Sequence, residues 1–210
     1  MQKAYKLNKL NNKAETLLFI KKKKFNVPDL LIFNCKNFLK NEIKIIKKIQ
    51  KKFKKKIAIR SSAKNEDGTK YSNAGKYLSY VNVDPKNTED LRKKILNVIK
   101  AYKNTNNIFF IQLMVKNIKL SGVVLTRDLN NYNPYLVVNY STGSDSTLVT
   151  SGKNKTKSIK YLPNKFYKTN KKFRILISLI LKLKKIFNYD LDVEFCIDKK
   201  GKVFILQVRS

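Results

Sequence analysis

The 210-residue sequence contains no histidine, and glycine, proline and cysteine are scarce. The lack of histidine excludes His-dependent acid–base catalysis, histidine metal ligands and a phosphohistidine within these residues. Only six glycines and four prolines are present, which predicts few long linkers. The two cysteines, Cys35 and Cys196, have no metal-site spacing and indicate a reducing cytosol rather than a disulfide scaffold.

Acidic residues are also scarce: 14 stand against 47 basic residues, and the formal net charge is +33. Such a charge predicts an anionic partner, which could be nucleic acid, anionic lipid or a phosphorylated ligand. However, 42 of the basic residues are lysines, and Lys, Asn and Ile, whose codons are A/T-rich, total 86 residues. An A/T-rich genome would produce this bias without any selected contact. The lysines are scattered, and base readers rely on Arg, Asn and Gln, so we expect no specific nucleic-acid partner.

Long hydrophobic runs are missing as well. The most apolar run, FRILISLILKL at 173–183, has 11 residues and includes Arg174 and Lys182. A bilayer span needs about 20 residues, so this run predicts a buried helix. The N-terminus, MQKAYKLNKLNNKAET, lacks the apolar core of a signal peptide. We therefore expect a cytoplasmic protein without membrane association.

The remaining pattern mixes helices and strands. Apolar residues recur at helical spacing in 36–53, from Leu39 and Ile43 to Phe53. Helices are predicted at 11–20, 36–53, 88–102 and 170–187. Strands are predicted at 57–60, 77–83, 108–115, 121–126, 134–140 and in a closing hairpin at 191–209. The polar segment KNTNN at 103–107 suggests two lobes, residues 1–106 and 107–210.

The closing hairpin, LDVEFCIDKKGKVFILQVR, is apolar except for a few polar side chains. A two-residue turn at Lys200-Gly201 would pair Glu194 with Gln207 and Asp192 with Arg209 on one face. Strict alternation would also place Val203 and Ile205 on the face of Gln207 and Arg209. Two interpretations remain open: a salt-bridged, solvated face, or a platform for a divalent cation and phosphate.

A second polar region follows the strand IAIR, where Arg60 stands at the strand end before a Ser-rich turn. Strand ends are common ligand positions in α/β proteins. The loop at 61–76, with Gly68 and Gly75, could place backbone amides over phosphates. The alternatives are a surface charge at Arg60 and an ordinary polar connection.

Together these motifs resemble the ATP-grasp domain of phosphoenolpyruvate synthase and pyruvate phosphate dikinase, which rifampicin phosphotransferase shares. AIRSSAKNEDGTKYSNAGKYLSYVNV (58–83) resembles the family's Arg-Ser-Ser-Ala segment. LDVEFCIDKKGKVFILQVR (191–209) resembles its closing Asp-x-Glu…Leu-Gln-x-Arg hairpin. The other matching segments, in the family's order, are NNKAETL with FNVPDLLIF, FIQLMV, SGVVLTRD and LVTSG. The resemblance implies an α+β, two-lobed ATP-grasp fold with a mostly antiparallel sheet in the second lobe.

The resemblance also implies how ATP phosphates would be bound between the lobes. Lys13 would contact them, and Arg60 and Arg209 would hold the phosphate being transferred as catalytic residues. Residues Ser72 to Gly75 would belong to the loop that covers the phosphates.

The metal and the base have implied ligands of their own. Glu194 and Gln207 would bind Mg²⁺, with Asp192 close to the same nucleotide. Gln112 to Val115, including Met114, would form the hinge beside adenine. The implied cofactors are therefore ATP and Mg²⁺.

Several features depart from the family pattern. Asn11-Asn12 replaces the usual Gly-Gly, Asp29 replaces a proline, and Leu129 replaces the proline after Thr-Arg-Asp. Nothing resembles the family's phosphohistidine domain or its phosphoenolpyruvate/pyruvate barrel. We therefore expect an ATP-dependent phosphotransferase that needs a phosphohistidine domain on another chain or a missing segment. A degenerate ATP-binding sensor or scaffold is the alternative, and a basic nucleic-acid binder rests on charge alone.

Overall fold

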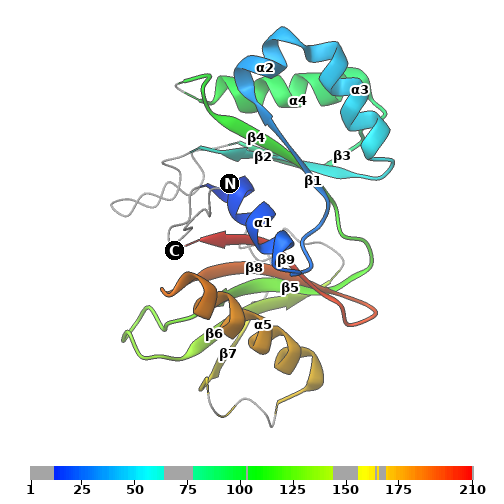
Figure 1. Ribbon diagram of the computed structural model, residues 1–210. Coiled ribbons are helices and arrows are strands. Elements are labelled where there is room, and N and C mark those ends of the chain that lie inside the picture. The colour runs from blue at the N-terminus through cyan, green and yellow to red at the C-terminus, as the bar shows by residue number, and fades with distance from the viewer. Residues whose placement is uncertain are drawn as a thin grey trace. The chain divides into compact units, whose positions relative to one another are not determined.

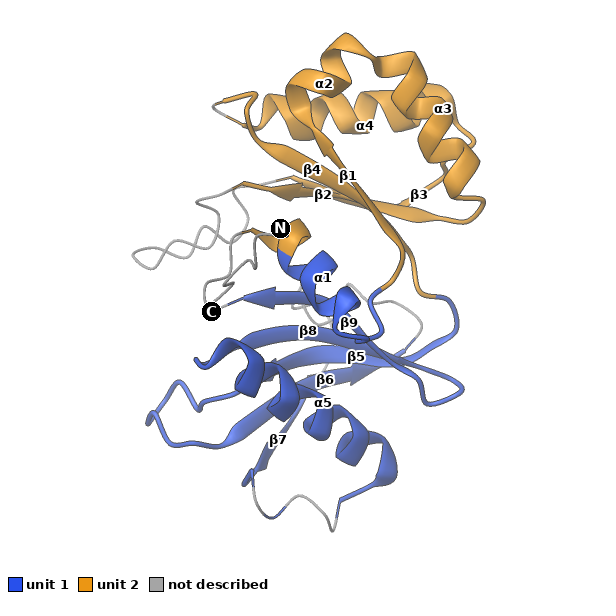
Figure 2. Cartoon of the chain, in the orientation of Figure 1, with its two compact units in different colours: residues 1–11, 16–27, 116–210 blue, residues 12–15, 28–115 orange. Residues whose placement is uncertain are grey.

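The computed structural model describes residues 12–63, 78–102, 104–143, 156–163, 165 and 169–209. The chain forms two compact units (Figure 2). Unit 2 contains residues 12–15 and 28–115, and unit 1 contains the remainder of the chain. The sequence pattern suggested a division at residue 106. The units differ from this division because the strand at 108–113 pairs with strands of unit 2. Most of the first helix, which precedes residue 28, also belongs to unit 1.

Unit 2 contains a four-stranded sheet in the order β1-β4-β2-β3, in which every neighbouring pair is antiparallel. Three helices cover one face of this sheet (Figure 1). The strands are β1 (Leu30–Asn34), β2 (Ile57–Ser62), β3 (Ser79–Val83) and β4 (Ile108–Leu113). The helices are α2 (Cys35–Lys40), α3 (Glu42–Lys52) and α4 (Thr88–Lys100).

The predicted helix at 36–53 is two helices, because the chain breaks at Asn41. This residue ends α2 and begins α3 with non-helical φ and ψ of −134° and 36°. Its side-chain amide donates to the backbone and side-chain oxygens of Asn37. The break changes which apolar residues face the core. Leu39 and Ile43 are 46% and 74% exposed, whereas Ile46 and Ile49 pack in the core of unit 2.

Unit 1 contains a five-stranded antiparallel sheet in the order β7-β6-β5-β8-β9. Its strands are β5 (Ile118–Leu125), β6 (Leu136–Thr142), β7 (Lys157–Tyr161), β8 (Asp192–Asp198) and β9 (Val203–Arg209). Edge strand β7 was not predicted from the sequence, because its five residues, KSIKY, offer little apolar alternation. At the other edge, Ile205 N of β9 donates to Asn26 O at 2.9 Å, which partly covers the edge.

Helix α5 (Lys171–Phe187) covers one face of this second sheet (Figure 1). Its Phe173 ring meets the Tyr140 ring of β6 with centroids 5.0 Å apart. Helix α1 (Lys13–Lys22) starts in unit 2, continues in unit 1 from Thr16, and its Phe19 ring contacts Phe187 at 5.8 Å. The apolar run at 173–183 is thus a helix, as predicted, but only one of its faces is buried, since Ile175 is 41% exposed. Among the helices described, none has the length and hydropathy that a bilayer crossing requires.

The close packing of β5 against β6 leaves no room for a side chain at Gly122. A Cβ atom at this position would lie 2.1 Å from Asn139 O and 2.9 Å from Tyr140 Cα, both in strand β6. We expect Gly122→Ala to lower the free energy of unfolding by about 3 kcal/mol, because strand backbone cannot move aside cheaply. Urea denaturation followed by circular dichroism measures this change.

Gly201→Ala is the matched control. Gly201 has φ +84°, but a Cβ there would meet nothing within 4 Å. Its expected cost is about 1 kcal/mol, from backbone conformation alone. Equal costs for the two variants would contradict the steric argument.

Candidate functional site

The β8–β9 hairpin has the predicted pairing of polar residues. Asp192 lies opposite Arg209, and Glu194 lies opposite Gln207. Directly opposed residues of an antiparallel pair point to the same face. The register therefore places all four side chains on one face of the hairpin, and this prediction is confirmed.

The turn that was predicted to set this register is wrong. Asp198 and Lys202 close a three-residue loop, with Asp198 N donating to Lys202 O at 3.1 Å and Gly201 in the left-handed region. This shifts the pairing by one residue, so that Phe195 lies opposite Ile205. A bulge then inserts Leu206 between the pairs of Ile205 and Gln207 and restores the predicted pairs.

The bulge also corrects the expected positions of two apolar residues. Val203 and Ile205 lie opposite Ile197 and Phe195, so they share the face of those residues. Strict alternation had placed them beside Gln207 and Arg209. Because of the extra residue, Val203 and Ile205 point to one face of the hairpin, whereas Gln207 and Arg209 in the same strand point to the other.

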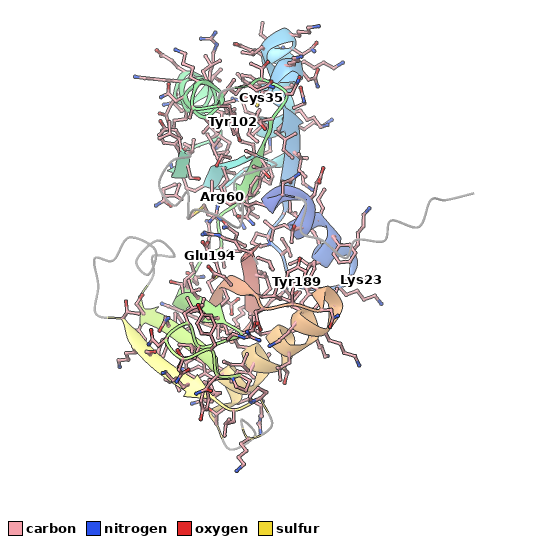
Figure 3. All side chains as sticks on the ribbon, turned by 90° about the vertical axis from the view of Figure 1, so that its left-hand side faces the viewer. Lys23, Cys35, Arg60, Tyr102, Tyr189 and Glu194 are labelled. Atoms are coloured by element: carbon pink, nitrogen blue, oxygen red, sulfur yellow. The ribbon has the colours of Figure 1, made fainter. Side chains whose placement is uncertain are left out.

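The polar face is the one that α5 leaves uncovered. Phe195 pairs with Gly122, and Gly122 pairs with Tyr140, whose ring contacts Phe173 of α5. Alternation puts Glu194 on the opposite face, in a row with Val123 and Asn139. Figure 3 shows Glu194 on this strand. The four polar residues therefore lie on the face of the sheet away from α5.

Arg209 contacts two of the other three side chains, Glu194 and Gln207. Its Nη2 lies 2.7 Å from Glu194 Oε1, in an ion pair whose carboxylate side chain is 12% exposed. With its amide oriented so that the oxygen faces Arg209, Gln207 accepts from Nε and from Nη2, the latter at 2.7 Å. The salt-bridged interpretation of the hairpin is therefore present in the structure. The pair is only partly exposed, with side-chain exposures of 32% for Arg209 and 12% for Glu194, and the neighbouring Gln207 is 4% exposed.

The start of β8 is held by the Thr-Arg-Asp turn that follows β5. Asp190 accepts from Thr126 Oγ1 at 3.2 Å and pairs with Lys184 and Arg127 at 2.7 Å each. Leu191 N donates to Thr126 Oγ1 at 2.7 Å. Burial alone would raise the pKa of Asp190, but the hydrogen bond and charge of Lys184, followed by Arg127, hold it below its usual value. This network fixes the backbone just before Asp192.

In unit 2, the predicted site residues on the sheet also lie on the face that the helices of this unit do not cover. Ile59 and Ile111 form one pair and pack in the core beneath the helices. Alternation puts Arg60, which pairs with Phe110, and Gln112 on the other face. Both sheets thus carry their predicted site residues on the face away from their helices.

Gln112 is unusual because its side-chain amide is buried and the amide nitrogen has no acceptor among the described residues. The residue is 2% exposed, and within the described part of the chain its Nε2 has no hydrogen-bond partner. A buried donor left unpaired costs about 1–3 kcal/mol, so a ligand acceptor would relieve a real penalty. After β4, Met114 N donates to Lys56 O at 3.0 Å, and unit 2 ends at Val115. The predicted hinge segment therefore ends at a unit boundary.

Lys13 is the first residue of α1 and is half-buried. Asn12 precedes it as the cap, with Glu15 N donating to Asn12 Oδ1 at 3.0 Å. The predicted residues Ser72 and Gly75 lie outside the described residues.

A metal ion would have few protein ligands. No group of three or more His, Cys, Asp or Glu gathers within the described residues. Glu194 and Gln207 supply a carboxylate and an amide oxygen side by side, which are hard ligands of the kind that Mg²⁺ prefers. Because Mg²⁺ usually takes one or two protein ligands together with phosphate oxygens and water, these residues fit it.

The comparisons with known proteins give the fold. No protein-family model matches the sequence, and no curated protein matches it either. Solved structures do match: D-alanyl-alanine synthetase A from Vibrio cholerae has a TM-score of 0.56 at 12% identity, covering 95% of this chain and 55% of that protein. This chain has the ATP-grasp fold. The predicted α+β class with antiparallel sheets is confirmed.

Two further matches have the same fold. D-Alanine-D-alanine ligase from Helicobacter pylori matches with a TM-score of 0.53 at 15% identity, covering 95% of this chain and 53% of the ligase. Ca. Korarchaeum cryptofilum ACD1, solved in complex with coenzyme A, matches with a TM-score of 0.54 at 12% identity, covering 94% and 91%. The chain spans about half the length of the synthetase and the ligase.

Sequence reasoning missed a contact between Ser62 and Asn12 beside Lys13. Ser62 Oγ donates to Asn12 Oδ1 at 2.9 Å and accepts from Ala14 N at 3.0 Å. The signals were an Asn before a helix and a Ser after Arg60. Neither shows that the two side chains meet, because they lie 50 residues apart in the chain.

The cysteines give a prediction that separates them from catalysis. Burial raises the pKa of Cys35 to about 11 and that of Cys196 to about 12, so neither is a nucleophile at neutral pH. We expect 5,5′-dithiobis-(2-nitrobenzoate) at pH 8 to modify both thiols at least about 100-fold more slowly in the folded protein than in guanidinium. Fast modification of either thiol in the folded protein would contradict this assignment.

Proposed function

We propose that this protein binds Mg-ATP as the nucleotide module of a phosphotransferase of the phosphoenolpyruvate synthase and pyruvate phosphate dikinase type. The supporting observation is the hairpin face, where Glu194, Gln207 and Arg209 come together on an ATP-grasp sheet. This combination is the one that the family resemblance implies. A solvated salt bridge would not require a buried Gln207 beside the ion pair.

Each residue has a distinct role in this proposal. Glu194 and Gln207 would hold Mg²⁺, which neutralises phosphate charge when it is bound. Arg209 and Arg60 would hold the phosphate that is transferred, since a planar guanidinium binds phosphate with two parallel hydrogen bonds. Asp192 would lie close to the same nucleotide site. The protein contributes mainly position and electrostatic stabilisation.

The base and the remaining phosphates would use other parts of the chain. Gln112 Nε2 would donate to a ring nitrogen of adenine and so satisfy its buried donor. Met114 and Val115 would border the base. Lys13 would contact the phosphates, and the loop of Ser72 and Gly75 would cover them.

The acceptor must lie outside this chain, because the chain has no histidine. We propose that the acceptor is a phosphohistidine domain on another chain or on a further segment, and that the transfer takes place in the cytoplasm. An ATP-binding sensor without transfer is the second candidate, favoured by Asn12 at the position of a family glycine. Phosphorylation of a His-bearing partner from [γ-³²P]ATP would exclude that candidate.

Calorimetric titration tests the nucleotide proposal directly. We expect saturable Mg-ATP binding by the wild type and a loss of at least about tenfold in affinity for Glu194→Ala, with magnesium no longer enhancing binding. Glu89→Ala, which removes an exposed carboxylate from the first turn of α4, is the matched control and should bind as the wild type does. Magnesium-dependent binding by Glu194→Ala would show that the metal assignment is wrong.

A second prediction concerns the cation that already contacts the proposed metal ligands. The Arg209 guanidinium contacts both Glu194 and Gln207, so it competes with a metal for their oxygens. We expect Arg209→Gln to bind Mn²⁺ about tenfold more tightly than the wild type without nucleotide, although it binds Mg-ATP more weakly. Electron paramagnetic resonance of free Mn²⁺ measures this, with Arg174→Gln on α5 as control. Equal Mn²⁺ affinity in wild type and Arg209→Gln would contradict it.

A further inference from the structure

Helix α1 begins at a buried junction where separated parts of unit 2 meet. Ser62, the last residue of β2, is 1% exposed, and Asn12 is 5% exposed. Ser62 Oγ donates to Asn12 Oδ1 at 2.9 Å. Ser62 N in turn donates to Tyr102 Oη at 2.8 Å, and Tyr102 Oη donates to Ile108 O at 2.6 Å. We call Asn12 and Ser62 the clamp.

Two backbone N–H groups in the first turn of α1 donate hydrogen bonds to the clamp. Ala14 N donates to Ser62 Oγ at 3.0 Å, and Glu15 N donates to Asn12 Oδ1 at 3.0 Å. Backbone amides at a helix start are common anion ligands because they have no partner within the helix. Here these two amides already have partners. The cationic group at this helix start is the Lys13 side chain.

The clamp also links Lys13 to the strand of Arg60. Ser62 is two residues beyond Arg60 on β2, so the two side chains share the face away from the helices. Asn12 directly precedes Lys13 in the chain. Two buried hydrogen bonds thus hold the backbone of one cationic residue to the strand that carries another. Such bonds contribute about 1 kcal/mol each to holding the start of α1 against β2.

We propose that Asn12 and Ser62 are positioning residues that fix Lys13 relative to Arg60 for the phosphates of the nucleotide. This inference rests on the proposed Mg-ATP binding and deepens it. The resembled family has glycine at the position of Asn12, and glycine has no side chain that could form this clamp. Here Lys13 is therefore placed by a side-chain contact to β2, and not by a glycine loop that approaches the phosphates.

The test is a double-mutant cycle on nucleotide affinity. We expect Ser62→Ala and Asn12→Ala each to weaken ATP binding about 5- to 10-fold, because Lys13 loses its fixed position. AMP, which has no β- or γ-phosphate, should change by less than about twofold. In a Lys13→Ala background, Ser62→Ala should have no further effect on ATP affinity. Calorimetry and competition with a fluorescent ATP analogue provide the measurements.

Asn87→Ala is the matched control, because Asn87 caps α4 of the same unit by accepting from Asp90 N. It should cost similar stability, about 1 kcal/mol, without any change in ATP affinity. Thermal unfolding confirms that each variant is folded; if Ser62→Ala does not fold, Asn12→Ala with Lys13→Ala completes the cycle.

The outcomes separate two failures. A full Ser62→Ala effect in the Lys13→Ala background, or equal losses for ATP and AMP, overturns the positioning role and leaves Mg-ATP binding intact. Absence of ATP binding in the wild type overturns the proposed function, and the clamp proposal with it. Coupling between Ser62 and Lys13 with unchanged AMP affinity supports the proposal.

Discussion

An antiparallel sheet presents alternate side chains to its two faces, and the other parts of this structure depend on that constraint. In each unit, the helices cover one face with apolar side chains, so every second residue of the strands is directed away from them. Arg60 and Gln112 occupy such positions in one sheet, and Glu194, Gln207 and Arg209 occupy them in the other. A polar side chain on the covered face that found no hydrogen-bond partner would cost about 1–3 kcal/mol. Pleating therefore limits where this fold can place functional side chains.

The hairpin shows how local irregularities preserve such an arrangement. A three-residue turn at Lys199 to Gly201 moves the register by one residue, and the bulge at Leu206 moves it back. Without the bulge, Gln207 and Arg209 would share the apolar face of Phe195. The bulge lies next to the polar pairs, where it both directs Gln207 to the correct face and leaves Val203 and Ile205 in the core.

Scarce carboxylates are placed at specific contacts in a chain of net charge +33. Asp190 joins Thr126, Lys184 and Arg127 at the start of β8, and buried Asp128 pairs with Lys160. Glu194 differs from these because its pair lies on the uncovered face beside Gln207. Its partner Arg209 forms the ion pair with it, and under the proposed function a nucleotide phosphate would offer the guanidinium an alternative anion. The Asp190 network, by contrast, holds the backbone at the start of β8.

The sequence by itself determined the helices, most strands and the ordered motifs, because these follow from periodicity and from residue types at short separations. It also predicted the polar pairs of the hairpin, because the error in the turn and the unpredicted bulge cancel there, although the pairs nearer the turn differ by one residue. Only the tertiary structure decided that Arg209 binds both Glu194 and Gln207, since alternation specifies a face but not a hydrogen bond. It likewise decided that α2 and α3 separate at Asn41 and that Asn12 meets Ser62. These features depend on specific side-chain contacts, most of them between residues distant in the chain, which no short pattern encodes.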